Sequence, residues 1–193
     1  SMGKLNGKVA IVTGAGRGLG KQVAIKFAEE GASLALSARS LDRLDETKRL
    51  CEEAGAKVFC GVCDVSSEED MARFVSDVGQ TFGHIDILYN NAMATTHGRI
   101  PLEEQTRDLW DTFYETGLLS VVTMMRLVFP YMKKQHYGKI ICVGSGAGIE
   151  GQDGMGAYGA IKEAVRAVAR TAAREWGQHN INVNTLNPGA ITD

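Results

Sequence analysis

The sequence predicts an α/β fold, a doubly wound parallel sheet with helices on both of its faces. Short apolar runs alternate with longer amphipathic segments along all 193 residues, and such alternation is typical of parallel strands joined by crossover helices. No linker, repeat or low-complexity segment interrupts the pattern. We therefore expect one domain over residues 1–193.

The first half of the chain contains three strands, each followed by a helix. Residues 8–12 and 33–38 are short apolar runs, and a glycine-rich turn leads from the first run into a mainly apolar helix. Residues 41–54 have the charged, amphipathic pattern of a helix, and residues 57–62 that of a third strand. The next helix, residues 66–82, is expected to have Ser66 as its N-cap, with Glu69 three residues on.

The second half continues the alternation. Residues 85–89 are the fourth strand, and a loop through Pro101 leads to a long helix over residues 107–134. Pro130 is expected to disturb the last turns of that helix. The remaining elements are a fifth strand from Ile140, a helix after Gly156 and a sixth strand at residues 181–186.

The turn after the first strand has the composition of a phosphate-binding turn. Gly14, Gly18 and Gly20 follow a strand and open a helix, which is the context such a turn needs. Glycine lets the backbone turn tightly and come close to a pyrophosphate, whose charge meets the amides of the helix N-terminus. A glycine-rich turn alone is weak evidence, and its position after the first strand strengthens it.

Tyr158 and Lys162 are candidate catalytic residues. They are four positions apart on the predicted helix, so their side chains share one face. A phenol beside an ammonium has its charged form stabilised, which suits it to pass a proton near neutral pH. Ser145 follows the preceding strand, where its hydroxyl could hold an oxygen on which charge develops. The pair alone also fits an ordinary amphipathic helix.

Taken together, these residues resemble the short-chain dehydrogenase/reductase family, over essentially the whole chain. The resemblance implies a single NAD(P)-binding Rossmann-type domain, and thirteen residues separate Ser145 from Tyr158 as in that family. The matching pieces, in the family's order, are Thr13-Gly14-x-x-x-Gly18-x-Gly20, Asp64-Val65, Asn90-Asn91-Ala92, Ser145, Tyr158-x-x-x-Lys162 and Asn187-Pro188-Gly189 with Thr192.

The resemblance also implies roles for individual residues. Tyr158 would be the general acid in carbonyl reduction and the base in alcohol oxidation, with Lys162 beside it and on the nicotinamide ribose. Ser145 would bind the substrate oxygen, and Asn90 would be mainly structural. The implied cofactor contacts are Gly14, Gly18, Leu19 and Gly20 at the pyrophosphate, Asp64 and Val65 at the adenine, Asn91 along the cleft, and Pro188, Gly189 and Thr192 at the carboxamide.

Two arginines favour NADP(H) over NAD(H). An acidic residue about 20 positions after the glycines binds the ribose 2′-hydroxyl of NAD, whereas arginine accommodates a 2′-phosphate. Ala38 and Arg39 end the second strand without an acid, and Arg17 within the turn adds a second cation. The alternative is that both arginines are merely solvated.

Three features depart from the family pattern. Gly117 stands about seven residues after Trp110-Asp111, where the family has a catalytic Asn that positions a water in its proton relay. Met93 replaces the usual glycine after Asn-Asn-Ala. The chain stops at Asp193, before the family's substrate-covering segment, so we expect either a C-terminally incomplete chain or a partner that covers the gap.

Composition limits which binding partners and which cellular compartment we expect. A net charge of −2 gives no reason to expect nucleic acid or an anionic membrane, and no apolar run reaches the length of a membrane span. Cytoplasm is the default expectation. Cys60 and Cys63 have the spacing of a redox dithiol, but they lie in an apparent strand and are expected to serve in packing. The four histidines have no metal-ligand spacing.

The sequence thus predicts an NADP(H)-dependent oxidoreductase that interconverts a carbonyl, of ketone or 3-oxoacyl type, and a secondary alcohol. The alternative is a catalytically impaired NADP(H)-binding sensor or scaffold protein of the same fold, which Gly117, Met93 and the missing C-terminal segment keep open. Arg166, Arg170 and Arg174 form a stripe that is usually a solvated face. In the family, this helix and the long one before it form subunit interfaces, so a homo-oligomer, dimer or tetramer, is expected.

Overall fold

A computed structural model describes residues 3–91, 98–144 and 150–187 of the chain. Its sheet has six strands in the order β3-β2-β1-β4-β5-β6, and every neighbouring pair is parallel. The chain therefore winds outward in both directions from the β1–β4 pair, which confirms the predicted doubly wound fold. The strands are β1 (Val9–Val12), β2 (Ser33–Ala38), β3 (Val58–Val62), β4 (Ile87–Asn90), β5 (Gly138–Val143) and β6 (Ile181–Leu186).

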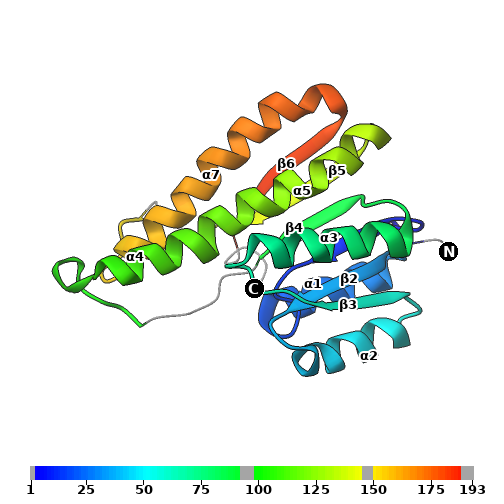
Figure 1. The fold of residues 1–193 in the computed structure, drawn as a ribbon, viewed down its shortest axis with the longest axis horizontal. Coiled ribbons are helices and arrows are strands. Elements are labelled where there is room, and N and C mark those ends of the chain that lie inside the picture. The colour runs from blue at the N-terminus through cyan, green and yellow to red at the C-terminus, as the bar shows by residue number, and fades with distance from the viewer. Residues whose placement is uncertain (1–2, 92–97, 145–149, 188–193) are drawn as a thin grey trace.

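Helices cover both faces of the sheet (Figure 1). The helices α1 (Gly18–Glu29) and α2 (Asp45–Glu53) pack on one face. The helices α3 (Glu68–Phe82), α5 (Ser120–Gln135) and α7 (Gly156–Trp176) pack on the other. Shorter helical segments are η1 (Leu41–Leu44), η2 (Leu102–Glu104), α4 (Arg107–Phe113), η3 (Tyr114–Leu119) and η4 (Gly177–His179).

Two hydrophobic cores result from the alternation of side chains along each strand. Ile11 on β1 belongs to the core beneath α3, α5 and α7, whereas its neighbours Ala10 and Val12 belong to the core beneath α1 and α2. All three are fully buried. Burial on both faces explains why these strands are continuously apolar in sequence.

Two helix starts differ from the sequence-based prediction. The predicted helix over residues 41–54 is divided into η1 and α2. Ser66 was expected to cap α3, but the cap is Ser67, whose hydroxyl accepts a hydrogen bond from the amide of Asp70 at 3.1 Å. Ser66 instead donates its hydroxyl to Asp64, at 2.7 Å. The serine nearer the helix has the geometry to reach an amide three residues on.

The predicted long helix is continuous but changes its winding in the middle. Between α4 and α5, the segment η3 is a π-helix, and Gly117 lies buried within it. Pro130 does not end α5, which continues to Gln135 and loses only the hydrogen bond that a proline cannot donate. Wide π turns inside α-helices occur often at functional sites.

The start of β4 is organised by a buried carboxylate. Asp86 accepts the main-chain amide of Val9 at 2.8 Å and lies 2.6 Å from Nδ1 of His84. Gln135, at the end of α5, donates to the other oxygen of Asp86 at 3.3 Å. The regular strand begins at Ile87, two residues after Ile85, where the sequence suggested it.

Candidate functional site

The glycine turn lies at the carboxyl edge of the sheet, after β1. Gly14 and Gly18 have positive φ angles of 60° and 56°, which a residue with a Cβ rarely adopts. A Cβ at Gly20 would lie 2.4 Å from the carbonyl oxygen of Gly14, so only glycine fits there. At Gly18, the first residue of α1, a Cβ would meet nothing within 4 Å among the described residues.

The first turn of α1 is not capped by the side chain of its own N-cap residue. Arg17 is the N-cap residue of α1, and its side chain makes no capping hydrogen bond. Helix N-termini whose amides lack a side-chain partner bind anions well, because the amides and the helix dipole point to the same place. The turn therefore fits the pyrophosphate of a dinucleotide.

Contacts from three other elements hold the turn in shape. The hydroxyl of Thr13 accepts the amide of Asn91 at 2.8 Å and donates to the carbonyl of Tyr89 at 3.3 Å. The amide of Ala15 donates to Ser37 on β2 at 3.2 Å. Thr47, fully buried on α2, donates its hydroxyl to the carbonyl of Ala15 at 2.8 Å. Sequence reasoning missed Thr47, because a threonine in a charged helix carries no signal of such a role.

Asn90 and Asn91 have different tasks. Asn90 is buried, and its side-chain amide donates to the carbonyl of Val121 at 3.0 Å, which ties β4 to α5. Asn91 is half-buried, with its amide nitrogen 3.0 Å from the position of a Cβ on Gly20. Asn90 is therefore structural, as expected, while Asn91 lies against the glycine turn.

Arg39, Asp64 and Val65 come together at the ends of β2 and β3. The amide of Cys63 donates to the carbonyl of Ala38 at 2.9 Å, which brings the residues that follow each strand side by side. Val65 is buried, and Arg39 is exposed. Hydrogen bonds from Ser66, together with the nearby charge of Arg39, hold the pKa of Asp64 below its ordinary value.

Arg17 is also exposed, at the start of α1. Arg17 and Arg39 reach the edge from neighbouring elements, the glycine turn after β1 and the end of the paired strand β2. Both therefore lie on the side of the sheet where α1 begins. A pair of exposed cations at this edge fits a phosphate group.

The Tyr158–Lys162 pair lies in the first half of α7, and the structure brings the two side chains together. Nζ of Lys162 is 5.9 Å from the centre of the Tyr158 ring. On its other side, the ring meets Phe113 of α4 edge-on, with centroids 6.2 Å apart. Phe113 was missed from the sequence, because its contact with Tyr158 depends on how two helices pack.

Lys162 is a buried cation. It is 6% exposed, and Nζ donates to the carbonyl of Val143, at the end of β5, at 3.1 Å. Burial lowers the pKa of Lys162 from 10.5 to about 8, because the charged form is poorly solvated there. Lys162 is therefore still mostly protonated at neutral pH. Val143, whose carbonyl holds the ammonium, lies two residues before Ser145 in the sequence.

Four predicted site residues lie outside the described part of the chain. These are Ser145, Pro188, Gly189 and Thr192, as are Ala92 and Met93. Gly117 is described: it is buried in η3, a helical segment that packs against α7. The main chain there is also engaged by side chains, since Ser120 donates its hydroxyl to the carbonyl of Thr116 at 2.5 Å.

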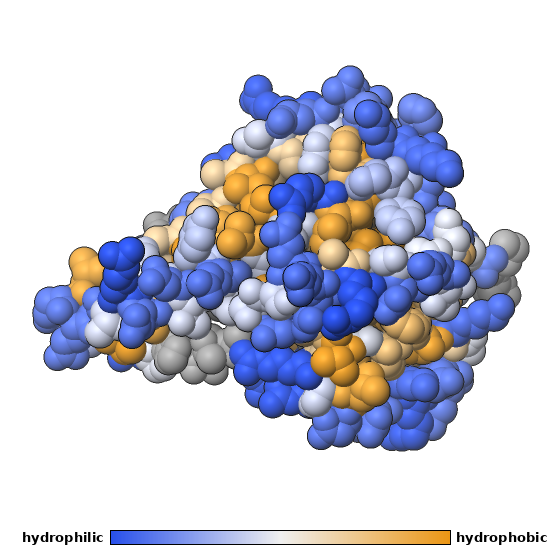
Figure 2. Space-filling view, in the orientation of Figure 1, coloured by the Kyte–Doolittle hydropathy of each residue, from blue (hydrophilic) through white to orange (hydrophobic). Residues whose placement is uncertain are grey.

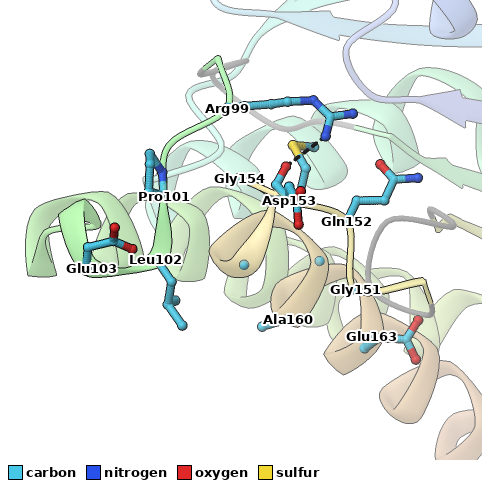
Figure 3. A pocket seen from close by; sticks show the side chains of 13 residues that line it. Arg99, Pro101, Leu102, Glu103, Gly151, Gln152, Asp153, Gly154, Ala160 and Glu163 are labelled. Carbon is cyan, nitrogen blue, oxygen red and sulfur yellow. Dashed lines mark hydrogen bonds between the residues drawn. The ribbon is translucent and has the colours of Figure 1, made fainter.

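A hollow of about 800 Å³ lies beside this pair, over another face of α7 (Figure 3). Gly159, Ala160 and Glu163 of α7 line one side of it, and a strap, residues 99–105, lines another through Arg99, Pro101, Leu102 and Glu103. Neither Tyr158 nor Lys162 lines it. The helical positions explain the separation, because residues 159, 160 and 163 point away from the face that carries residues 158 and 162.

The other candidates have structural explanations. Burial raises the pKa of Cys60 and raises that of Cys63 to about 11, which disfavours the thiolate that a redox dithiol needs. Within residues 3–91, 98–144 and 150–187, no three His, Cys, Asp or Glu side chains are placed to hold a metal. Arg166 departs from the expected solvated stripe, since its Nε is 3.0 Å from Glu163 and its side chain is largely buried. Among the described helices, none has the length and hydropathy to span a bilayer.

Comparison with known proteins places this arrangement among dehydrogenases. A family model described as short chain dehydrogenase matches residues 8–192. A 12α-hydroxysteroid dehydrogenase of Clostridium sp. is 41% identical over an alignment of 198 residues, gaps included, and the alignment covers 99% of this chain and 76% of that protein. A 3-oxoacyl-acyl-carrier-protein reductase of Thermotoga maritima is 36% identical over 188 residues, and the alignment covers 97% of this chain and 76% of that protein. Among solved structures, NAD⁺-bound xylitol dehydrogenase has a TM-score of 0.90 at 35% identity, covering 95% of this chain and 70% of that one.

Replacing Lys162 by methionine is expected to stabilise the cofactor-free protein near neutral pH, by an amount that shrinks in alkali. The folded pKa lies below the unfolded one, so the unfolded chain binds more protons between about pH 8 and 10.5, and stability rises with pH in that window. The cost of the buried charge, roughly 3 kcal/mol for such a shift, is thus fully present below about pH 8 and declines as the pH rises toward 10.5. Thermal unfolding at about pH 6.5 and about pH 9.5 measures this difference.

Lys139→Met is the matched control, because Lys139 is exposed on β5 and its ammonium stays in water in the folded and the unfolded chain. Its effect on the melting temperature should be the same at both pH values. A gain for Lys162→Met that does not depend on pH would contradict the buried charge.

Proposed function

The chain belongs to the short-chain dehydrogenase/reductase family of oxidoreductases, and we propose that it is an NADP(H)-dependent member that interconverts a carbonyl and a secondary alcohol. The observation that carries the proposal is the pairing of Tyr158 with the buried ammonium of Lys162 at the carboxyl edge of a dinucleotide-type sheet. The 12α-hydroxysteroid dehydrogenase and the 3-oxoacyl reductase, by their names, support this chemistry.

In the proposed reaction the side chains move a proton. The nicotinamide cofactor, when bound, supplies the hydride for reduction and accepts it in oxidation. Tyr158 donates its hydroxyl proton to the carbonyl oxygen during reduction and accepts it back in oxidation. Lys162, mostly charged at neutral pH and held by Val143, stabilises the tyrosinate that remains. Ser145 hydrogen-bonds the substrate oxygen.

The proposed cofactor contacts follow the geometry of the carboxyl edge. Gly14, Gly18, Leu19 and Gly20 would hold the pyrophosphate on the first amides of α1. Arg17 and Arg39 would hold the 2′-phosphate. The remaining contacts would be Asp64 and Val65 at the adenine, Asn91, Tyr158 and Lys162 along the cleft, and Pro188, Gly189 and Thr192 at the carboxamide.

We also propose that the protein works as a homo-oligomer in the cytoplasm. Tyr114 and Leu119 of η3 are large apolar residues that are nearly half exposed. Figure 2 shows hydrophobic side chains gathered over α5 and α7, and a second group on the same face over β3 and α2. The four cysteines are free thiols, as is usual in a reducing compartment. Sedimentation velocity measures the size of the assembly.

Tyr158→Phe is expected to abolish turnover, since general acid–base assistance is worth about 10²- to 10⁴-fold. The assay follows oxidation of NADPH with a panel of steroid ketones, 3-oxoacyl thioesters and sugars. Tyr114→Phe is the matched control, because Tyr114 is exposed on η3, and it should keep full activity. Undiminished turnover in Tyr158→Phe would sink the assignment.

NADPH is expected to bind at least tenfold more tightly than NADH. A charge-assisted contact contributes roughly 1.5–3 kcal/mol, and tenfold requires about 1.4. Arg39→Ala should remove most of the preference and leave NADH binding nearly unchanged, as measured by fluorescence titration. Arg49→Ala, which removes an exposed arginine paired with Glu53 on α2, is the control. Equal affinities in the unmodified protein would overturn the preference, and the NAD⁺-bound xylitol dehydrogenase makes this a real alternative.

A catalytically impaired NADP(H)-binding sensor or scaffold is the second candidate, favoured by Gly117 in place of the family's Asn. Tight NADPH binding without turnover on any member of the panel would support it. Our proposal instead is that a water held by main-chain carbonyls of η3 serves in the relay, since a polar gap with two or more partners accommodates one.

Gly117→Asn is therefore expected to change turnover by less than about tenfold, well below the 10²- to 10⁴-fold that a restored proton relay would give. Initial rates with saturating NADPH and ketone check this, on a chain that includes any segment after Asp193. A gain above a hundredfold, with NADPH affinity unchanged, would show that the native relay is defective.

A further inference from the structure

The N-terminus of α7 lacks a cap from its own sequence. Met155 is the N-cap residue, and its side chain makes no capping hydrogen bond. Tyr158 lies in this first turn, two residues after the helix begins at Gly156. The first turn of a helix has amides without intrahelical partners and frays unless something outside it accepts them.

Gln105 supplies the missing acceptor from a distant part of the chain. Its side-chain oxygen accepts the amide of Ala157, the residue before Tyr158, at 3.2 Å. Its side-chain nitrogen donates to the carbonyl of Ile100 at 3.0 Å. The half-buried amide group therefore links the first turn of α7 to the strap of residues 99–105.

Two contacts hold the opposite end of the strap, near Arg99, and neither of them involves α7. Nη1 of Arg99 donates to the carbonyl of Asp153 at 2.8 Å, a bond drawn in Figure 3. The amide of Ile100 donates to the carbonyl of Gly154 at 3.1 Å. A Cβ on Gly154 would lie 2.5 Å from that of Arg99, so the two segments touch.

The same stretch of chain also reaches the ring of Tyr158. Gln105 immediately precedes Thr106, the N-cap of α4, whose hydroxyl accepts the amide of Leu109 at 3.2 Å. At the end of α4, Phe113 packs edge-on against the Tyr158 ring. Residues 105–113 thus hold both the main chain before Tyr158 and the face of its ring.

We propose that Gln105 is a positioning residue for the reaction, acting on Tyr158 through the amide of Ala157. This inference rests on the proposed role of Tyr158 as the proton donor. A phenol held by one turn of helix must keep its hydroxyl in place relative to Lys162, and misplacement by about 1 Å can lower a rate about a hundredfold. Gln105 restricts that turn without contacting the reacting atoms.

Gln105→Met tests the proposal, because methionine has nearly the same shape but cannot accept the amide. We expect kcat for NADPH-dependent ketone reduction to fall at least tenfold, with the Kd of NADPH within twofold of the unmodified value. Gln105→Glu keeps an acceptor oxygen at a helix N-terminus, where negative charge is favourable, but loses the bond donated to Ile100. Because the proposal depends on the bond to Ala157, kcat should stay within threefold. Gln105→Ala, which leaves the amide open to water, is the second variant should Gln105→Met fail to fold, with the same expectation.

Arg99→Met is the matched control, since it removes the strap's other side-chain bond and leaves the Ala157 contact. It should keep kcat. Equal losses in Arg99→Met and Gln105→Met would overturn the proposal, as would full activity in Gln105→Met when Tyr158→Phe is inactive.

Hydrogen exchange separates this inference from the proposed function. The amide of Ala157 should lose protection in Gln105→Met and keep it in Gln105→Glu, whether or not the protein turns over. If Tyr158→Phe is fully active and Ala157 still loses protection, the assignment of Tyr158 fails and with it the catalytic part of the inference, while the contact stands. Unchanged protection in Gln105→Met would overturn the contact itself.

Discussion

The pairing of β1 with β4 is the constraint on which the rest of the structure depends. The chain leaves these two central strands in opposite directions, toward β2 and toward β5, so their carboxyl ends form the switch point at which such sheets bind ligands. Thr13 holds the two strand ends together, because its amide and its hydroxyl both form hydrogen bonds with the end of β4. The glycine turn and Asn91 are thereby placed against each other, and the ends of β2, β3 and β5 are brought to the same edge.

Lys162 shows how the fold places a charged group at this edge of the sheet. A lysine that is almost completely buried loses hydration, and a single carbonyl, that of Val143, accepts from it among the described residues. The fold maintains this unfavourable charge because α7 is packed between β5 and the α4–η3 segment. The same packing puts Phe113 on the ring of Tyr158, so the cation and the phenol are held by one set of contacts.

Several contributors to the candidate site could not be predicted from the sequence. Gln105 lies 52 positions from Ala157, and Thr47 lies 32 positions from Ala15, so neither pair has a local signature. The π turn at Gly117 was likewise missed, because hydrophobic periodicity does not distinguish one widened turn from a regular helix. The expected Ser66 cap was wrong by one residue, since two adjacent serines compete and only the geometry of the turn decides between them.

The sequence by itself determined the order of strands and helices, the glycine turn and the shared face of Tyr158 and Lys162. These depend on interactions within a few residues, namely the periodicity of apolar side chains, the freedom of glycine and the pitch of a helix. Only the tertiary structure decided that Lys162 is buried, that Arg39 follows β2 beside the end of β3 and that Gln105 caps the helix of Tyr158. Those outcomes depend on desolvation and on contacts between distant segments, which exist only after the sheet has brought its carboxyl ends together.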